Sequence, residues 1–221
     1  MLTIEKTVLP SPEQWEIAIE GMRNPKNSWH LSDSYITYIE DAQTLERAAY
    51  EHFVGEKDMK LMTQLAAGGA VHAKYRRMLP VWVTINAPLY WWKECDTYKI
   101  GTVANSCSTM HKIHAKEFSL DDFSHEHLSD ASLFGLKTIV KVLNYYRAEY
   151  LESKNKDDWW QLIQLLPSSY NQKRTVMLNY EVLCNIYHSR KDHKLDEWHT
   201  FCRWVEGLPY AEELITGRRD G

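Results

Sequence analysis

A polar segment in the middle of the chain carries the side chains best suited to bind a ligand. Residues 102–111 read TVANSCSTMH, so threonine, asparagine, serine, cysteine and histidine fall close together. The segment is too polar for a core element and too irregular for an amphipathic helix. Loops held by a rigid scaffold carry a large share of binding residues. We therefore predict a ligand-binding loop at residues 102–111.

Thiols and imidazoles in and around this loop leave two other chemistries open. The candidates are Cys107, His111 and His114, with Cys95, His125 and His127 on either side. Zinc sites usually show tighter paired spacing. We therefore predict no metal site and keep a metal-dependent hydrolase as an alternative. A Cys107 nucleophile with His111 as its base is a further alternative, which requires a helical loop because side chains four residues apart meet on a helix.

The segments before the loop can position it. Residues 79–86 alternate apolar and polar side chains, which is the period of a half-buried strand. Pro88 follows, and proline suits the first position of a helix because its missing N–H would have no partner there. We expect this helix to gather polar side chains such as Glu94 toward its far end, to reach Lys99, and to stop at Gly101.

The remainder of the chain is predicted to be mostly helical. Ser11 and Gln14 form a capping box that begins one helix. Helices are expected at 11–22, 32–53, 56–67, 129–151, 156–166, 179–190, 194–206 and 210–216, and short strands at 2–9 and 172–178. Because helices dominate and strands are few, we predict an α+β fold with a small antiparallel sheet covered by several helices.

The helix expected at 32–53 depends on one apolar face. Ser32 or Asp33 would cap its first turn. The apolar face would comprise Ile36, Ile39, Ala42, Leu45 and Ala49. This spacing fits a period of 3.6 residues, so the segment is predicted as a helix rather than as strands.

Composition limits the class of protein. The chain has 221 residues, 44% of them hydrophobic, which is enough to bury one core in a single domain spanning residues 1–221. A net charge of -4 argues against a nucleic-acid partner. No stretch approaches the roughly 18 apolar residues of a membrane helix, and the first residues lack a signal-peptide core. The four cysteines show no paired spacing that would indicate a disulfide framework. We expect a cytoplasmic protein.

The order of these segments resembles that of the flavin-dependent (ThyX-type) thymidylate synthases. That family has a glycine-histidine pair, a strand ending in Ala-Pro, a helix ending in Arg-His-Arg, and a Ser-x-Asn-Glu-x-Ser-x-Arg-Tyr loop. Here the corresponding pieces are GGAVHAKYRRM, a strand to Asn86, Ala87-Pro88, a helix to Lys99, and TVANSCSTMH. The opening SPEQWEIAIEGMRNP is similar to the family's first helix, so the resemblance covers most of the chain.

Matched spacing carries this resemblance through both halves of the chain. In the first half, His72, Asn105 and Ser108 keep the family's intervals. In the second half the matches are Leu166-Pro167, Asn179, Asn185 and Arg190. The family's Arg-His-Arg is replaced here by Thr97, Tyr98 and Lys99, its glutamate after Asn105 by Ser106, and its Arg-Tyr pair by Met110 and His111.

The resemblance implies a reaction and a set of site residues. The family moves a one-carbon unit from methylenetetrahydrofolate to C5 of dUMP, with hydride from reduced FAD, which NADPH recharges. By this resemblance Arg190 would contact and polarise the pyrimidine, and Ser108 would hold its phosphate. The substrate-binding residues would be Glu94, Ser106, Ser108 and Arg190, and the cofactor-binding residues His72, Lys99, Asn105, Asn179 and Asn185. A homotetramer is implied because the family's sites lie at subunit interfaces.

The replaced arginines keep two further possibilities open. One is a related pyrimidine nucleotide or another one-carbon donor in place of those of the family. The other is a non-catalytic nucleotide-binding or structural protein that keeps the scaffold and has lost the flavin. Arg190 could also simply complement the dipole at a helix C-terminus.

Overall fold

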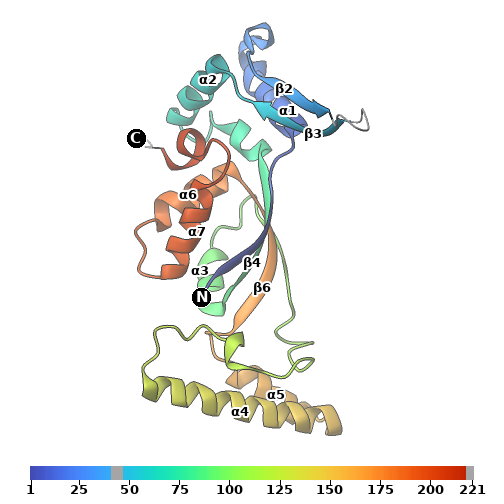
Figure 1. Cartoon of the computed structure of the whole chain (residues 1–221). Helices are drawn as coiled ribbons and strands as arrows, with labels where there is room; N and C mark the ends of the chain where they lie inside the picture. Colours follow the sequence, from blue (N-terminus) through green and yellow to red (C-terminus); the bar gives the residue numbers. More distant parts are fainter. Residues whose placement is uncertain (41–46, 218–221) are drawn as a thin grey trace. The chain divides into compact units, whose positions relative to one another are not determined.

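The computed structural model describes residues 1–40 and 47–217 and combines helices with two sheets (Figure 1). The strands are β1 (Thr3–Val8), β2 (Tyr35–Glu40), β3 (Arg47–Phe53), β4 (Pro80–Pro88), β5 (Val103–Ser106) and β6 (Asn171–Asn179). The α-helices are α1 (Pro12–Arg23), α2 (Glu56–Ala67), α3 (Leu89–Cys95), α4 (Asp130–Ser153), α5 (Lys156–Leu165), α6 (Tyr180–Arg190) and α7 (Asp196–Glu206). The short turns are η1 (Asn24–Lys26), η2 (Trp29–Leu31), η3 (Lys74–Met78), η4 (Leu120–Asp122) and η5 (Glu212–Thr216).

Two sheets organise the strands. The larger is a four-stranded antiparallel sheet in the order β1-β4-β6-β5, and the smaller is the β2-β3 hairpin. Hairpin pairing runs from Tyr35 opposite Phe53 to Glu40 opposite Arg47, with a register shift between Ile39 and Glu40. The predicted α+β class with a small antiparallel sheet is therefore confirmed.

The described residues form two compact units. The first contains residues 1–5, 84–97 and 104–176, and the second contains the described residues of 6–83, 98–103 and 177–221. Strands β1, β4 and β6 each contribute residues to both units. The prediction of one domain over residues 1–221 stays a prediction.

The core of the first unit is aromatic and aliphatic. Helices α4 and α5 lie side by side and cover a buried cluster (Figure 1). Its buried members are Ile113, Phe118, Phe123, Leu136, Leu143 and Leu162. The indoles of Trp91 and Trp92 are also buried in this unit, with ring centroids 4.8 Å apart, and Trp92 Nε1 donates to the Gln172 carbonyl at 2.8 Å. Burial of this apolar surface is the main force that holds α4 and α5 in place.

The second unit packs α1, α6 and α7 around a separate aromatic core. Trp15 of α1 meets the rings of Tyr180 and Tyr210 edge to face, at centroid distances of 5.6 and 5.3 Å. Helices α6 and α7 lie side by side (Figure 1). Trp198 and Phe201 of α7 are fully buried. This core fixes the position of α6, which carries several of the residues predicted to bind ligands.

The helix predicted at residues 32–53 is wrong, because β2 and β3 form a hairpin there. The sequence YITYIE of β2 is rich in β-branched and aromatic residues, which favour an extended, half-buried backbone. Ala42 and Leu45, counted on the predicted apolar face, lie outside the described residues. Asp33, one of the two residues proposed as the cap of the predicted helix, caps α2 instead. The Asp33 carboxylate accepts hydrogen bonds from the backbone N–H groups of Lys57 and Asp58.

Three details of the central prediction also change. Pro88 ends β4 with an extended backbone and caps α3, so it is not the first helical residue. Helix α3 stops at Cys95 and does not reach Lys99. The predicted loop contains a short edge strand, β5, which pairs with β6.

Most other element predictions are confirmed. Ser11 and Gln14 form the predicted capping box of α1. Ser129 caps α4 by accepting from the backbone N–H of Ser132. Helices α2, α5, α6 and α7 and strands β1 and β6 lie close to their predicted bounds. The predicted last helix is a short π turn, η5.

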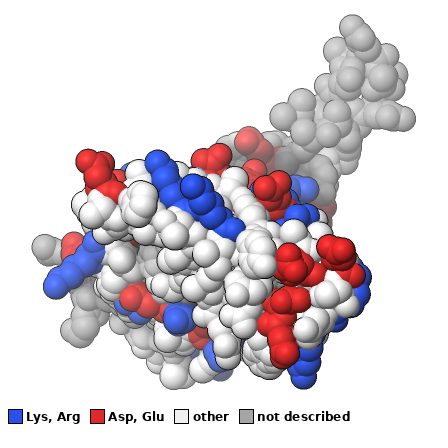
Figure 2. Space-filling model, turned by 90° about the horizontal axis from the view of Figure 1, so that it is seen from below, with Lys and Arg blue, Asp and Glu red and all other residues white. Residues whose placement is uncertain are grey.

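On the face shown in Figure 2, acidic and basic side chains are interspersed. Over residues 1–40 and 47–217, none of the helices is both long enough and apolar enough to cross a membrane.

Candidate functional site

Arg190, the last residue of α6, is held by two aromatic side chains. Its Nε donates a hydrogen bond to the Tyr98 hydroxyl at 2.9 Å. Its guanidinium carbon lies 5.1 Å from the centroid of the Trp198 ring and 5.6 Å from that of the Tyr98 ring. A guanidinium at these distances is attracted to the ring faces. Trp198 is fully buried and Arg190 is half-buried, so the cation sits on a rigid floor.

The segment from Tyr98 to Thr102 is tied to the beginning of the same helix. Asn179 caps α6, because its Oδ1 accepts from the Val182 backbone N–H at 3.0 Å. Its Nδ2 donates to the Gly101 carbonyl at 3.4 Å. The Thr102 hydroxyl donates to the Tyr98 carbonyl at 2.8 Å and closes the turn. Both polar atoms of the Asn179 side chain therefore have partners within the chain, and this residue holds the turn against α6.

The other predicted cofactor residues of this unit occupy different surroundings. Lys99 is exposed within the same turn. Asn185 is half-buried on α6, but it lies about 140° from Arg190 around the helix axis at 100° per residue. Of the residues predicted to bind ligands, Lys99 thus lies within the 98–102 turn, Asn179 contacts the Gly101 carbonyl of that turn, and Arg190 contacts the Tyr98 hydroxyl.

His72 lies apart from this group in the sequence, between α2 and η3. It is exposed and lines a cavity of about 460 Å³. Apolar side chains that include Met22, Tyr75 and Met78 line the cavity, and two lysines, Lys26 and Lys74, line it as well. A histidine in this setting can contact an aromatic or anionic ligand.

The residues predicted from the loop belong to the first unit. Asn105 and Ser106 are exposed in β5. The Ser108 hydroxyl oxygen accepts from the backbone N–H groups of Met110 and His111, at 3.3 and 2.9 Å. These two N–H groups point at Ser108, so the donor that Ser108 itself can offer to a ligand is its hydroxyl hydrogen.

Glu94 is half-buried in the last turn of α3. The same unit contains an arginine, Arg174, that was not among the predicted site residues. The guanidinium of Arg174, in β6, lies 4.3 Å from the centroid of the Trp92 ring. Arg174 Nη1 donates to Asp96 at 2.8 Å, and its Nε donates to Gln172 Oε1 at 2.9 Å. The one sequence signal was the pair of cations, Lys173 and Arg174, in an otherwise regular strand. Because Arg174 is paired with a carboxylate, its charge is largely compensated within this unit.

The thiol and imidazole alternatives gain no support from the geometry. Residues 107–111 are irregular and not helical, so the helical contact that a Cys107–His111 pair required is missing. Cys107 is instead fixed to β6, since its N–H donates to the Lys173 carbonyl and its carbonyl accepts from Gln172 Nε2. Among the described residues, no group of three or more His, Cys, Asp and Glu side chains could hold a metal ion.

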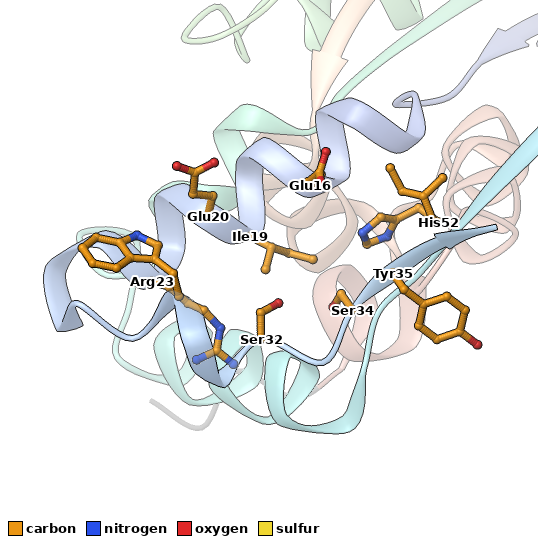
Figure 3. Close-up of a pocket in the computed structure, with 10 residues that line it drawn as sticks. Glu16, Ile19, Glu20, Arg23, Ser32, Ser34, Tyr35 and His52 are labelled. Carbon is orange, nitrogen blue, oxygen red and sulfur yellow. The ribbon is translucent and has the colours of Figure 1, made fainter. Parts of the chain in front are cut away.

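A second cavity lies where the sequence predicted a helix. It measures about 260 Å³ and lies between α1 on one side and residues 29–36 with His52 of the β2-β3 hairpin on the other (Figure 3). The lining residues are Glu16, Ile19, Glu20, Arg23, Trp29, Ser32, Ser34, Tyr35, Ile36 and His52. Burial lowers the pKa of His52, although the charge of Asp58 opposes this. None of the residues predicted to bind a ligand lines this cavity, because the hairpin itself was not foreseen.

The fold and these side chains define an α+β protein with a cation presented at the end of a buried helix. No protein-family model matches the chain, and none of the curated proteins matches it. Solved structures of other proteins do match the chain. Flavin-dependent thymidylate synthase ThyX from Helicobacter pylori, complexed with FAD and dUMP, superposes with a TM-score of 0.61 at 17% identity over 97% of each chain.

A second structure of the Helicobacter pylori enzyme with FAD and dUMP gives the same TM-score and identity over 97% of this chain and 96% of that one. The UMP/dUMP methylase PolB from Streptomyces cacaoi, bound with 5-Br dUMP, gives 0.57 at 10% identity, over 98% and 94% of the two chains. This chain therefore has the fold of the flavin-dependent thymidylate synthases. The predicted resemblance to them is confirmed at the level of the fold.

Proposed function

We propose that this chain binds a pyrimidine nucleotide, dUMP or a close relative, and methylates its base at C5. The observation that carries the proposal is the half-buried Arg190 guanidinium, fixed by the Tyr98 hydroxyl and the Trp198 ring. A planar guanidinium with a fixed orientation suits a carbonyl oxygen of a pyrimidine. The fold that this chain shares with the two methylating enzymes supports the same assignment.

The chemistry asked of Arg190 is electrostatic. When a pyrimidine reacts at C5, negative charge develops on the ring and its carbonyl oxygens. A preorganised cation stabilises this charge more strongly in a half-buried site than in water. Ser108 offers its hydroxyl hydrogen to the nucleotide phosphate, and Glu94 and Ser106 complete the predicted substrate contacts. These roles in the first unit follow from the resemblance and belong to the proposal.

Reduced FAD, when bound, would supply the hydride, methylenetetrahydrofolate the one-carbon unit, and NADPH the electrons that recharge the flavin. By the resemblance, the side-chain amides of Asn105 and of Asn185 would each pair with polar atoms of the flavin. Lys99 is exposed and offers a cation to the flavin phosphates, and His72 can contact the cofactor from its own cavity. Asn179 would act by holding the turn that carries Lys99.

The proposal includes the quaternary structure and location expected from the sequence. We infer a cytoplasmic homotetramer in which subunits share their sites. Sedimentation measurements with and without dUMP would test the oligomer.

The cofactor part of the proposal is tested by the absorbance spectrum of freshly purified protein, taken before and after addition of FAD and desalting. A retained band at about 450 nm, from the electronics of the flavin itself, is expected. A turnover assay with dUMP, methylenetetrahydrofolate and NADPH should then yield the 5-methyl product. Protein that retains no flavin and yields no product would contradict the enzymatic proposal.

One observation favours a second candidate, a nucleotide-binding protein that has lost the flavin. Two of the three positions of the family's Arg-His-Arg carry neutral side chains with partners in the chain. The Thr97 hydroxyl donates to the Glu94 carbonyl at 2.7 Å, and the Tyr98 hydroxyl accepts from Arg190. Thr97 stands in place of the family's first arginine, and its hydroxyl cannot replace a bidentate guanidinium on a phosphate. Colourless protein whose melting temperature rises with dUMP would identify this candidate.

A further inference from the structure

The orientation of Arg190 is set by a closed series of contacts that begins and ends on α6. At the start of the helix, Asn179 caps the first turn and donates to the Gly101 carbonyl at 3.4 Å. Three residues earlier in the chain, the Tyr98 hydroxyl accepts from Arg190 at the other end of the helix. The 98–102 turn therefore contacts both ends of α6, and both contacts lie within the second unit.

Each member of this series is itself constrained. Gly101 has a φ of +80°, and a Cβ at that position would lie 2.7 Å from Asn179 Nδ2. A glycine is thus required both by the backbone conformation and by the close approach of Asn179. The Tyr98 carbonyl accepts from the Thr102 hydroxyl, and the Tyr98 ring meets the buried Trp198 ring edge to face at 6.4 Å. Tyr98 is consequently placed by its backbone and by its ring.

An arginine side chain has many rotamers, and the contacts of Arg190 with Tyr98 and Trp198 each exclude some of them. The Tyr98 hydroxyl accepts from Nε, the one N–H of the guanidinium that lies on the side-chain stem, so this contact does not use the N–H groups of the two terminal nitrogens. The Trp198 face restricts the plane of the group from a second direction. Preorganisation of this kind lowers the entropy lost when a ligand binds.

We propose that Tyr98 is a positioning residue: its hydroxyl, through the Nε hydrogen bond, sets the guanidinium of Arg190 in the orientation that receives the pyrimidine base. This inference rests on the proposed function, because it assigns Arg190 to the nucleotide. It adds a role for a position at which the sequence shows tyrosine in place of the family's histidine. Tyr98 acts through Arg190 and has no assigned contact with the base.

The test compares two tyrosine-to-phenylalanine variants. Tyr98→Phe removes the hydroxyl and keeps the ring on Trp198. Tyr187→Phe is the matched control, because Tyr187 lies on α6, as Arg190 does, but its hydroxyl donates to Glu206, at 2.8 Å, and has no part in the Nε hydrogen bond of Arg190. By calorimetric titration with dUMP, Tyr98→Phe should raise the Kd about tenfold, the effect of losing one hydrogen bond to a charged group. Tyr187→Phe should leave the Kd within about twofold.

A second pair of titrations asks whether Tyr98 acts through Arg190. In an Arg190→Lys background the charge remains but the Nε–H is gone. Tyr98→Phe should then change the Kd by less than about twofold, since coupled residues lose their effect when the partner is removed. An equal tenfold loss in both backgrounds would overturn the proposal, as would an unchanged Kd for Tyr98→Phe in the wild-type background.

A readout without ligand separates this inference from the proposed function. The Nε–H proton of Arg190, observed by NMR in the full chain, should exchange slowly with water in the wild type and in Tyr187→Phe, and quickly in Tyr98→Phe. If the wild type binds no dUMP at millimolar concentration, the proposed function fails. The exchange measurement then still decides whether Tyr98 orients Arg190, and equal exchange in all three proteins refutes it.

Discussion

Arg23 donates a hydrogen bond from Nε to Oδ1 of Asp58 at 2.6 Å, and both side chains are buried. The other carboxylate oxygen of Asp58 accepts from the hydroxyls of Ser32 and Ser34 and from two backbone N–H groups. This pair joins the end of α1 to the first turn of α2 and fixes the segment that leads into the β2-β3 hairpin.

Removing the Asp58 carboxylate should destabilise the second unit. Asp58→Ala leaves the Arg23 guanidinium buried without its counter-charge, and such a break costs about 3–5 kcal/mol. The matched control is Asp157→Ala, an exposed aspartate in the first turn of α5, for which we expect less than about 1 kcal/mol. Urea unfolding of both variants gives the free energies. An equal loss of unfolding free energy in the two variants would show that the buried Arg23–Asp58 pair stabilises the protein no more than an exposed aspartate does.

The Asp58 carboxylate should also make the free energy of unfolding depend on pH in the acid range. Burial alone would raise the pKa of Asp58, but hydrogen bonds from Ser32, Ser34, Arg23 and the Asp33 N–H outweigh it and hold the pKa below its usual value of 3.8. Because the folded pKa is depressed, the stabilisation is present above pH 3.8 and is lost as the pH falls through the folded value.

The measurement is the free energy of unfolding of wild type and Asp58→Asn between about pH 6 and pH 3. The free energy of unfolding of the wild type should exceed that of Asp58→Asn at pH 6. This difference should shrink as the pH falls below 3.8, the usual pKa of an aspartate carboxyl. A difference that stays constant over this range would mean that Asp58 does not titrate with a depressed pKa.

Gly101 should tolerate alanine less well than another glycine with a similar backbone. Gly69 has a φ of +87°, and a Cβ added there would meet nothing within 4 Å, whereas a Cβ at Gly101 would approach Asn179. Gly69→Ala should cost about 1 kcal/mol from backbone strain alone, and Gly101→Ala at least about 2 kcal/mol. Thermal unfolding compares the two. If Gly101→Ala were the milder change, the contact between the 98–102 turn and α6 would not constrain that turn.

Gly135 should gain stability on substitution. It lies in the interior of α4, and a Cβ there would meet nothing within 4 Å. Gly135→Ala should raise the free energy of unfolding by about 0.5–1 kcal/mol, because glycine loses more backbone entropy in a helix than alanine does. A loss of stability in denaturant titrations would indicate that a partner covers this face of α4.

Local signals in the sequence predicted much of the fold. Ser11 with Gln14, and Ser129, are caps whose partners lie within three residues, so the helices that they begin could be placed without knowledge of tertiary structure. The cap formed by Asp33 could not be placed from nearby residues in this way. Asp33 caps α2 from more than twenty residues away in the sequence, and a short polar side chain does not reveal which helix it will cap.

Local sequence signals also predicted part of the candidate site. Arg190 and Asn179 lie at the ends of one helix whose bounds the sequence indicates. The aromatic floor under Arg190 was not predictable, because Tyr98 and Trp198 meet it from 92 and 8 positions away in the sequence, respectively, and only tertiary packing brings the three together. The cavity beside α1 was missed because a helix was predicted in place of the hairpin.

The assignment of Arg190 to a pyrimidine nucleotide can be measured by calorimetric titration of dUMP into wild type, Arg190→Ala and Arg203→Ala. Arg203 is a matched control, since it is an exposed arginine on α7 whose Nη2 donates to the Thr200 hydroxyl at 3.0 Å. We expect the wild type and Arg203→Ala to bind dUMP equally, and Arg190→Ala to bind about a hundredfold more weakly, which corresponds to about 2.7 kcal/mol. Equal affinity in all three proteins, or no binding by the wild type, would contradict the assignment of Arg190 to a pyrimidine nucleotide.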